Sequence, residues 1–322
     1  MLPKERIIFI IGPTAVGKSE IAVSLAKKLS GEIISLDSMQ IYKNMDIITS
    51  KPTHGQMKSV PHHIISVLAL AKEYNVSQYR KTDLKKVMVI LKKGRKTSLE
   101  KVKAILRKGK IPIFAGGTGL YMSVLIDGIF KEKAQNKIIR SKLYKISQKQ
   151  GSNYLYKKLK KVDPQAAFKI HPNDIRRIIR ALEVFKITGK PISALQRQRQ
   201  GLKDKYEIKV FCLNMKRDKL YQRIDQRVER MFKQGLICEV KRLLKKRLSR
   251  TASCAIGIKE LKGYFLGQYD LAEAKRLIQR NSRHYAKRQL TWFRKDKRID
   301  WVNLSGNDKP IKIAKRLWKK LC

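Results

Sequence analysis

The 322-residue sequence has few acidic side chains, few cysteines and no long apolar run. Its 25 Asp and Glu stand against 75 Lys and Arg, which gives a formal net charge of +50. No apolar run approaches the length of a membrane-spanning helix, and the N-terminus leads directly into a predicted strand, so neither a signal peptide nor a membrane anchor is indicated. The four cysteines are scattered without a C-x-x-C pair, which favours a reduced, cytoplasmic protein without structural zinc.

The excess of positive charge indicates a polyanionic partner. Repulsion among so many like charges destabilises a compact monomer unless something negative compensates. A lysine-rich proteome with basic protein surfaces is the alternative explanation, and it accounts for part of the charge. Nucleic acid is the first candidate for the partner, and the chain length allows one or two domains.

A phosphate-binding motif lies near the N-terminus. The β-branched run 6–11 is typical of a buried parallel strand, and the next eight residues read GPTAVGKS, a full match to G-x-x-x-x-G-K-[ST]. In such a loop the backbone N–H groups surround an anion, Lys18 adds a positive charge and Ser19 can hold Mg²⁺. The residues expected to bind a di- or triphosphate are Gly12, Pro13, Thr14, Ala15, Val16, Gly17, Lys18 and Ser19.

Asp37 is the one carboxylate expected at the carboxyl end of a core strand. It ends the strand-like segment 32–37, whereas the later apolar runs 111–115 and 210–213 end without an acid. Open α/β sheets bind their ligands at this edge. A motor ATPase normally has a metal-binding acid and a water-activating group, so a single acid favours a reaction that removes one proton. A helix or turn cap is the alternative role for Asp37.

Two weaker signals follow in the N-terminal half. Residues 116–121 read GGTGLY after a predicted strand, which would bring the Thr118 hydroxyl close to the ligand of the first loop. The adjacent His62 and His63 point to opposite sides of an extended segment and lack a third ligand nearby. Structural hydrogen bonds are therefore favoured over a metal site for the two histidines.

Residues 80–94 and 95–109 form an internal duplication, in which ten of fifteen positions are identical. Each copy is predicted to be a short amphipathic helix that ends at a glycine. A local duplication is favoured over a functional array, because repeat folds usually need three or more units.

The second half of the sequence predicts basic helices. Asn173 is expected to cap a helix over 174–188, with an apolar stripe on one side and arginines on the other. A strand is predicted over 207–213, and the helix after it carries arginines at i, i+4 and i+7. Asp270 is expected to cap the last long helix, where basic and aromatic residues alternate in a pattern that suits phosphate and base contacts.

Taken in order, the blocks GPTAVGKS, LDSMQIYKNMDI, VPHH and GGTGLY resemble those of the tRNA dimethylallyltransferases, also called tRNA isopentenyltransferases. HPNDIRRIIRALEVFKITGKP, RIDQRVERMFKQGLICEV and RHYAKRQLTWFR are similar to later blocks of this family, so the resemblance runs from Ile7 to about Trp301. A single block such as GGTG is unspecific, but the ordered set is highly specific. The duplication departs from the family pattern, in which one helix leads into the strand before GGT.

The resemblance implies an α/β fold, with a P-loop NTPase-like core whose parallel β-sheet is flanked by helices, plus a helical insertion domain. We expect the catalytic core in residues 1–129 and 202–322, and an insertion that contacts the tRNA anticodon stem in residues 130–201. The implied activity is transfer of a dimethylallyl group from dimethylallyl diphosphate to N6 of the adenosine 3′-adjacent to the anticodon. The implied cofactor is Mg²⁺, at Ser19, in a cytoplasmic monomer that binds no membrane.

The resemblance also implies roles for individual residues. Asp37 would accept the N6 proton, and Thr118 would hold the diphosphate or orient Asp37. Lys18 and Arg223 would stabilise the leaving diphosphate. The residues expected to bind tRNA are Asp37, Ser38, Met39, Gln40, Thr118, Arg140, Arg176, Arg177, Ile178, Ile179, Arg180, Arg283, Lys287 and Arg288.

Three other functions remain to be distinguished. A P-loop small-molecule kinase would share the loop and a strand-end acid, but it would not need this charge or the basic aromatic helix. An adenylate isopentenyltransferase would act on a free nucleotide, which the long basic insertion disfavours. A nucleic-acid-binding protein without activity would leave Lys18, Asp37 and Thr118 unexplained.

Deletion of residues 80–94 is expected to give a folded, active transferase, because one copy of the duplicated helix is enough to reach the strand at Ile111. Transfer activity should stay within about tenfold of wild type, a change of about 1.4 kcal/mol or less. The affinity for tRNA should fall modestly, since lysines and arginines are lost. An insoluble product, or a folded one without activity, would show that the extra copy belongs to the core or to the tRNA-binding surface.

Overall fold

The computed structural model describes residues 5–80, 98–130 and 135–321. The chain forms two compact units, one made of Met1–Ile126 with Lys205–Cys322 and the other of Asp127–Asp204. Both ends of the chain therefore build the first unit, and the second is a continuous insertion. No helix in the described ranges combines the length and apolarity that crossing a bilayer requires.

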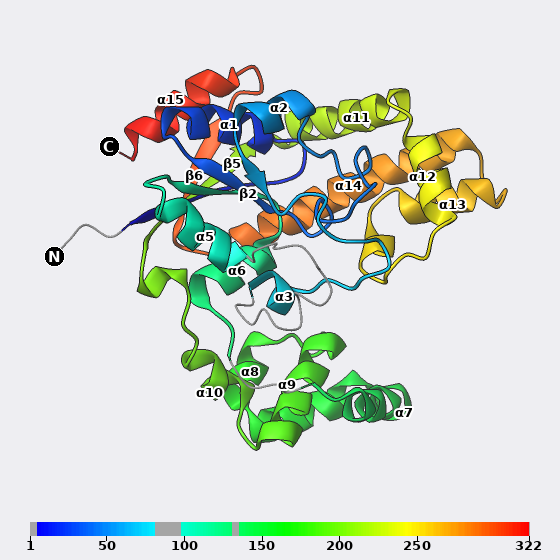
Figure 1. Ribbon diagram of the computed structural model, residues 1–322. Helices are drawn as coiled ribbons and strands as arrows, with labels where there is room; N and C mark the ends of the chain where they lie inside the picture. Colours follow the sequence, from blue (N-terminus) through cyan, green and yellow to red (C-terminus); the bar gives the residue numbers. More distant parts are fainter. Residues whose placement is uncertain (1–4, 81–97, 131–134, 322) are drawn as a thin grey trace. The chain divides into compact units, whose positions relative to one another are not determined.

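A parallel β-sheet forms the centre of the first unit (Figure 1). In the described part of the chain its order is β3-β2-β4-β1-β5-β6, and every pairing is parallel. The strands are β1 (Arg6–Ile11), β2 (Glu32–Leu36), β3 (His62–His63), β4 (Pro112–Gly116), β5 (Glu207–Met215) and β6 (Ile299–Leu304). The predicted α/β fold is confirmed, and β1 is buried almost throughout, as expected for a parallel strand covered on both faces.

Helices connect and cover these strands. Those before the insertion are α1 (Lys18–Lys28), α2 (His54–Ser59), α3 (Val76–Arg80), α5 (Ser98–Leu106) and α6 (Gly119–Asp127). Those after it are α11 (Arg217–Lys233), α12 (Leu236–Leu244), α13 (Ile258–Phe265), α14 (Leu271–Phe293) and α15 (Pro310–Lys319), with a 3-10 turn at Ala252–Cys254. Asp270 caps α14 as predicted, because its side chain accepts a hydrogen bond from the Glu273 N–H at 2.7 Å.

The duplicated segment is described only in part. α5 lies within the second copy, where a helix was predicted, and it ends before Gly109. Apart from Arg80, the first copy lies outside the described residues.

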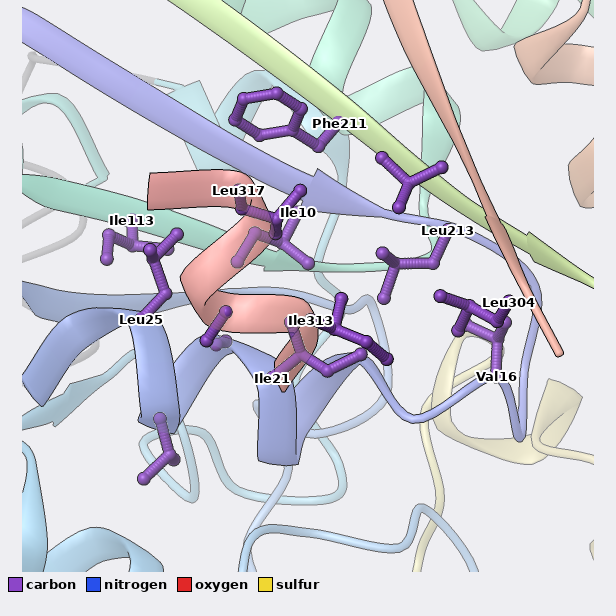
Figure 2. Close-up of a cluster of buried hydrophobic side chains, with 14 of the residues drawn as sticks. Ile10, Val16, Ile21, Leu25, Ile113, Phe211, Leu213, Leu304, Ile313 and Leu317 are labelled. Atoms are coloured by element: carbon purple, nitrogen blue, oxygen red, sulfur yellow. The ribbon is translucent and has the colours of Figure 1, made fainter. Parts of the chain in front are cut away.

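The first and last helices of the chain pack together on one face of the sheet (Figure 2). Ile21 and Leu25 of α1 are buried with Ile313 and Leu317 of α15, against Ile10 of β1. Figure 1 shows α5 and α6 on the opposite face. Each such buried side chain contributes roughly 1.5–3 kcal/mol, so this cluster fixes α1 and with it the loop that precedes α1.

The second unit is helical. Its elements are α7 (Lys137–Val162), α8 (Pro164–Lys169), α9 (Ile175–Thr188), α10 (Ile192–Arg197) and a 3-10 turn at Leu202–Asp204. Leu155 and Leu159 of α7 pack in one apolar core with Leu182 of α9.

The N-terminal cap of α9 differs from the prediction. The side chain of Asp174, not of Asn173, accepts a hydrogen bond from the Arg177 N–H at 3.1 Å. Asparagine and aspartate are both good caps, and the helix begins one residue later than the sequence pattern indicated. The predicted end at Gly189 is confirmed, where φ is 67°.

Candidate active site

The phosphate-binding loop joins β1 to α1 at the carboxyl edge of the sheet. At Gly12 φ is 147°, and a Cβ atom there would lie 2.6 Å from the carbonyl oxygen of Leu213, so glycine is required. α1 begins at Lys18, so the unpaired N–H groups of its first turn and the positive end of its dipole lie at the loop. Backbone of this shape binds anions.

Lys18 lies over this loop. Its Nζ donates a hydrogen bond to the Pro13 carbonyl oxygen at 2.6 Å. The pKa of Lys18 is lowered to about 8, mainly by desolvation and also by the positive charge of Arg227, while the charge of Asp37 opposes both effects. A negative ligand in the loop would favour the charged form of Lys18.

A cavity of about 970 Å³ opens beside the loop. Lys18, Ser19, Asp37 and Gln40 contribute to its wall. The helix α11 adds three arginines from one face, namely Arg223, Arg227 and Arg230. The cavity therefore combines an anion-binding loop with a concentration of positive charge.

A smaller cavity of about 250 Å³ shares part of this wall. Six residues line both cavities, namely Thr14, Asp37, Thr49, Arg227, Met231 and Tyr285. The rest of the smaller cavity has a largely apolar lining that includes Ile48, Ile224, Val228, Ala255, Ile256 and Ile278. The larger, positively charged cavity thus meets a largely apolar one at a carboxylate and a guanidinium.

Asp37 has the turn-capping role that the sequence analysis gave as an alternative, and it also borders both cavities. Its Oδ1 accepts hydrogen bonds from the N–H groups of Met39 at 2.8 Å and Gln40 at 3.4 Å, so it caps a turn. The same side chain borders both cavities. The turn holds the carboxylate at the junction, where it can act on a bound ligand.

Thr118 lies beside Asp37 in the second glycine-rich turn. Its N–H donates to the Leu36 carbonyl oxygen at 3.1 Å, and its buried Oγ1 lies next to the hydroxyl of Tyr285. Burial raises the pKa of the Tyr285 hydroxyl, and the charge of Asp37 raises it further. The Tyr285 hydroxyl therefore stays protonated near the carboxylate.

Gln289 of α14 connects the two glycine-rich turns. Its Oε1 accepts a hydrogen bond from the Thr14 N–H at 2.9 Å, and its Nε2 donates to the Gly117 carbonyl oxygen at 3.0 Å. A Cβ atom at Gly117 would lie 2.0 Å from Gln289 Nε2, so a side chain there would displace the Gln289 amide.

Arg227 is a site residue that the sequence reasoning did not select. It donates to Ser50 Oγ from Nε at 2.9 Å and to Thr14 Oγ1 from its terminal nitrogen. Burial lowers the pKa of Arg227, and Asp37 opposes this effect. The available signal was its spacing of four residues from Arg223, because i and i+4 share one helix face.

The residues predicted to bind tRNA have several environments in the first unit. Ser38, Met39 and Arg288 line the smaller cavity, and Lys287 is exposed. The Arg283 side chain donates to both carboxylate oxygens of Asp225, at 2.8 and 2.9 Å, and so ties α14 to α11.

Two of the predicted residues in the second unit point into its core. Ile178 and Ile179 have only 0% and 1% of their surface exposed, because they form the apolar stripe of α9. Their side chains are therefore not available to an RNA. Arg176 and Arg177 are exposed on the same helix.

Arg140 and Arg180 share one buried partner in the second unit. Both donate to Glu183 Oε2, at 2.8 and 2.9 Å, and Glu183 also accepts the Asn136 N–H at 2.9 Å. These bonds hold the pKa of Glu183 below its usual value despite desolvation. The carboxylate fixes two of the arginines predicted to bind tRNA.

The residues around the phosphate loop suit a hard cation. The Ser19 hydroxyl and the Asp37 carboxylate line the same cavity, and Mg²⁺ takes such oxygen ligands.

The two adjacent histidines make structural hydrogen bonds. His62 Nδ1 hydrogen-bonds with the Val60 carbonyl oxygen and His63 Nε2 with Glu32, each at 2.7 Å. Among the described residues no group of three or more His, Cys, Asp or Glu is placed to hold a metal ion.

Comparison with known sequences gives a consistent result. The sequence profile of a family described as IPP transferase matches residues 40–296. The tRNA dimethylallyltransferase of Halothermothrix orenii is 45% identical over 305 residues, covering 94% of this chain and 88% of that protein. The tRNA dimethylallyltransferase of Bacillus subtilis is 42% identical over 305 residues, covering 94% and 92%.

Solved structures resemble this fold over nearly the whole chain. The full-length tRNA isopentenylpyrophosphate transferase from Bacillus halodurans superposes with a TM-score of 0.69 at 38% identity, covering 99% of this chain and 97% of that one. A eukaryotic dimethylallyltransferase acting on tRNA gives a TM-score of 0.75 at 29% identity, covering 94% and 74%.

Proposed function

The chain belongs to the IPP transferase family and is a prenyltransferase that modifies tRNA, and from this premise we propose the detailed reaction. The dimethylallyl group of dimethylallyl diphosphate moves to N6 of the adenosine 3′-adjacent to the anticodon, and diphosphate is released. The observation that carries this proposal is the position of Asp37, where the phosphate-binding cavity meets an apolar one. A proton acceptor is needed at such a point, between an anionic leaving group and an incoming amine.

The phosphate loop would bind the diphosphate end of the substrate. An exocyclic amine is a poor nucleophile, so the allylic C–O bond breaks ahead of attack and its electron pair leaves with the diphosphate. Lys18, Arg223 and the N–H groups of the loop stabilise this growing negative charge. Arg227 lies close enough to do the same. Mg²⁺ bound at Ser19 would add positive charge next to the diphosphate.

The acceptor adenosine must leave the base stack of the anticodon loop before its amine can be reached. N6 then bonds to the allylic carbon, and Asp37 takes the proton that N6 loses. Hydrogen bonds from the N–H groups of Met39 and Gln40 hold the carboxylate in place. The Thr118 hydroxyl lies where it can orient the carboxylate or the diphosphate.

The second unit would bind the anticodon stem, with the protein acting as a monomer. Arg176 and Arg177 are exposed at the first turn of α9, and arginine makes bidentate contacts with phosphate. Glu183 fixes Arg140 and Arg180 in the same unit. Fixed arginines lose less side-chain entropy when they bind a phosphate.

Arg176→Ala and Arg177→Ala are expected to weaken tRNA binding while leaving the transfer rate at saturating tRNA nearly unchanged. Each variant should reduce the slope of log affinity against log salt by about 1, because one phosphate contact is lost. The measurement is tRNA affinity over a series of salt concentrations. Lys186→Ala is the matched control, since it removes an exposed charge near the other end of the same helix. An equal change in the control would contradict a specific role for the two arginines.

The proposed reaction is tested with labelled dimethylallyl diphosphate and unmodified tRNA. We expect label in tRNA at N6 of the adenosine 3′-adjacent to the anticodon, and none in AMP or ATP offered as acceptors. Label in AMP or ATP in place of tRNA would indicate an enzyme that acts on free nucleotides. Label at another tRNA position would refute the proposed acceptor.

A further inference from the structure

Glu239 is a buried carboxylate with no part in the reaction described above. It lies on α12 and has 5% of its surface exposed. Its two oxygens accept hydrogen bonds from three consecutive backbone N–H groups, those of Asp46 at 3.0 Å, Ile47 at 2.9 Å and Ile48 at 2.9 Å. Hydrogen bonds to a charged acceptor are stronger than neutral ones, so Glu239 holds this backbone firmly.

The held backbone forms part of the wall between the two cavities. In the segment 46–50, Asp46, Ile47 and Ser50 line the larger cavity, and Ile48 lines the smaller one. Thr49 lines both. The carboxylate of Glu239 lines neither cavity, so it can affect this wall only through its hydrogen bonds to the backbone of the segment.

The same segment is bonded to Arg227. Ser50 Oγ accepts a hydrogen bond from Arg227 Nε at 2.9 Å, and the guanidinium also donates to Thr14 in the phosphate loop. A continuous series of bonds therefore runs from the Glu239 carboxylate through the backbone of 46–50 and the Ser50 hydroxyl to Arg227. Movement of the segment would change where the guanidinium lies relative to Asp37.

We infer that Glu239 is a positioning residue for the transfer reaction. By fixing the segment 46–50 it sets the wall shared by the two cavities, and through Ser50 it orients Arg227 at their junction. The inference rests on the proposed function, since it concerns the rate of that reaction. Small displacements in an active site are costly, because a shift of about 1 Å can lower a rate about 10²-fold.

The first test is Glu239→Gln, which keeps the size of the side chain but replaces one acceptor oxygen with an NH₂ group that faces an N–H. The single-turnover rate with both substrates saturating should fall at least about tenfold, with little change in KM for tRNA. Glu32→Gln is the matched control. Glu32 is equally buried and bonded to His63 and Lys110, but it lines neither cavity. Its variant should lose thermal stability yet keep a rate within about twofold of wild type.

Ser50→Ala removes the hydrogen bond between Ser50 and Arg227 without disturbing a buried charge. If Glu239→Gln does not fold, this variant alone tests the inference. Its rate should fall to a similar extent, and the double variant should be slower than Glu239→Gln by no more than about twofold, because both act through one series of bonds. The inference would be overturned by a wild-type rate in a folded Glu239→Gln or in Ser50→Ala. Equal rate losses in Glu239→Gln and Glu32→Gln would also overturn it, as would fully additive rate losses in the double variant of Glu239 and Ser50. A wild-type protein that does not prenylate tRNA in this assay would overturn the proposed function instead.

Discussion

Lys18→Ala is expected to lower kcat for dimethylallyl transfer by about 10²- to 10³-fold, because a positive group that faces the leaving diphosphate is removed. The Lys18 ammonium lies over the phosphate loop and near Asp37 and Arg227. In the proposed reaction this position brings it close to charge that develops only as the allylic C–O bond breaks. The affinity for tRNA should stay within about twofold of wild type, since the proposed partner of Lys18 is diphosphate and not RNA.

Single-turnover rates and tRNA binding, measured on the same preparation, separate these two effects. Lys27→Ala is the matched control, because Lys27 lies on the same helix and is exposed. The control should retain wild-type kcat. An equal loss of tRNA affinity in a folded Lys18→Ala protein would contradict the assignment of Lys18 to the diphosphate alone.

Asp37→Asn is expected to lower the rate of the chemical step by about 10²- to 10⁴-fold, the usual contribution of a general base. The asparagine Oδ1 can still accept the hydrogen bonds from Met39 and Gln40, so the turn should keep its shape. The capacity to take the N6 proton is lost together with one negative charge. Rapid-quench measurement of a single turnover, with enzyme in excess over tRNA, reports that step directly.

Glu20→Gln is the appropriate comparison for this variant. Glu20 lines the same larger cavity with an exposed side chain and lies outside the segment 46–50, so the substitution removes one negative charge without removing a proton acceptor at the junction. Its single-turnover rate should remain close to wild type. A near-normal rate in Asp37→Asn would exclude Asp37 as the base.

The local parts of this site could be predicted from the sequence because their signals are contiguous. GPTAVGKS specifies a loop between a strand and a helix, and the structure has that loop between β1 and α1. Asp37 follows a buried strand, and the topology of a parallel sheet brings it to the edge where the loop lies. Both features depend on short stretches of chain and a general rule of parallel sheets.

The residues that hold the site together could not be predicted, because they depend on tertiary contacts. Gln289 meets Thr14 across 275 residues of sequence, and Glu239 meets Asp46 across 193. A lone glutamine or glutamate on an amphipathic helix gives no indication of its partner. Local ambiguity had smaller effects, as with the adjacent Asn173 and Asp174, which are equally good caps.

The discontinuity of the first unit has a consequence for biosynthesis. β1 pairs with β5, whose Glu207 bonds to Arg6 across 201 residues, and α1 is covered by α15 from the last residues of the chain. The N-terminus emerges from the ribosome first during synthesis. The phosphate-binding loop therefore emerges long before β5 and α15, which complete its support. The inserted unit is continuous in sequence and needs no such partner. It can begin to fold while the nascent chain is still attached, whereas the first unit can close only after α15 has emerged.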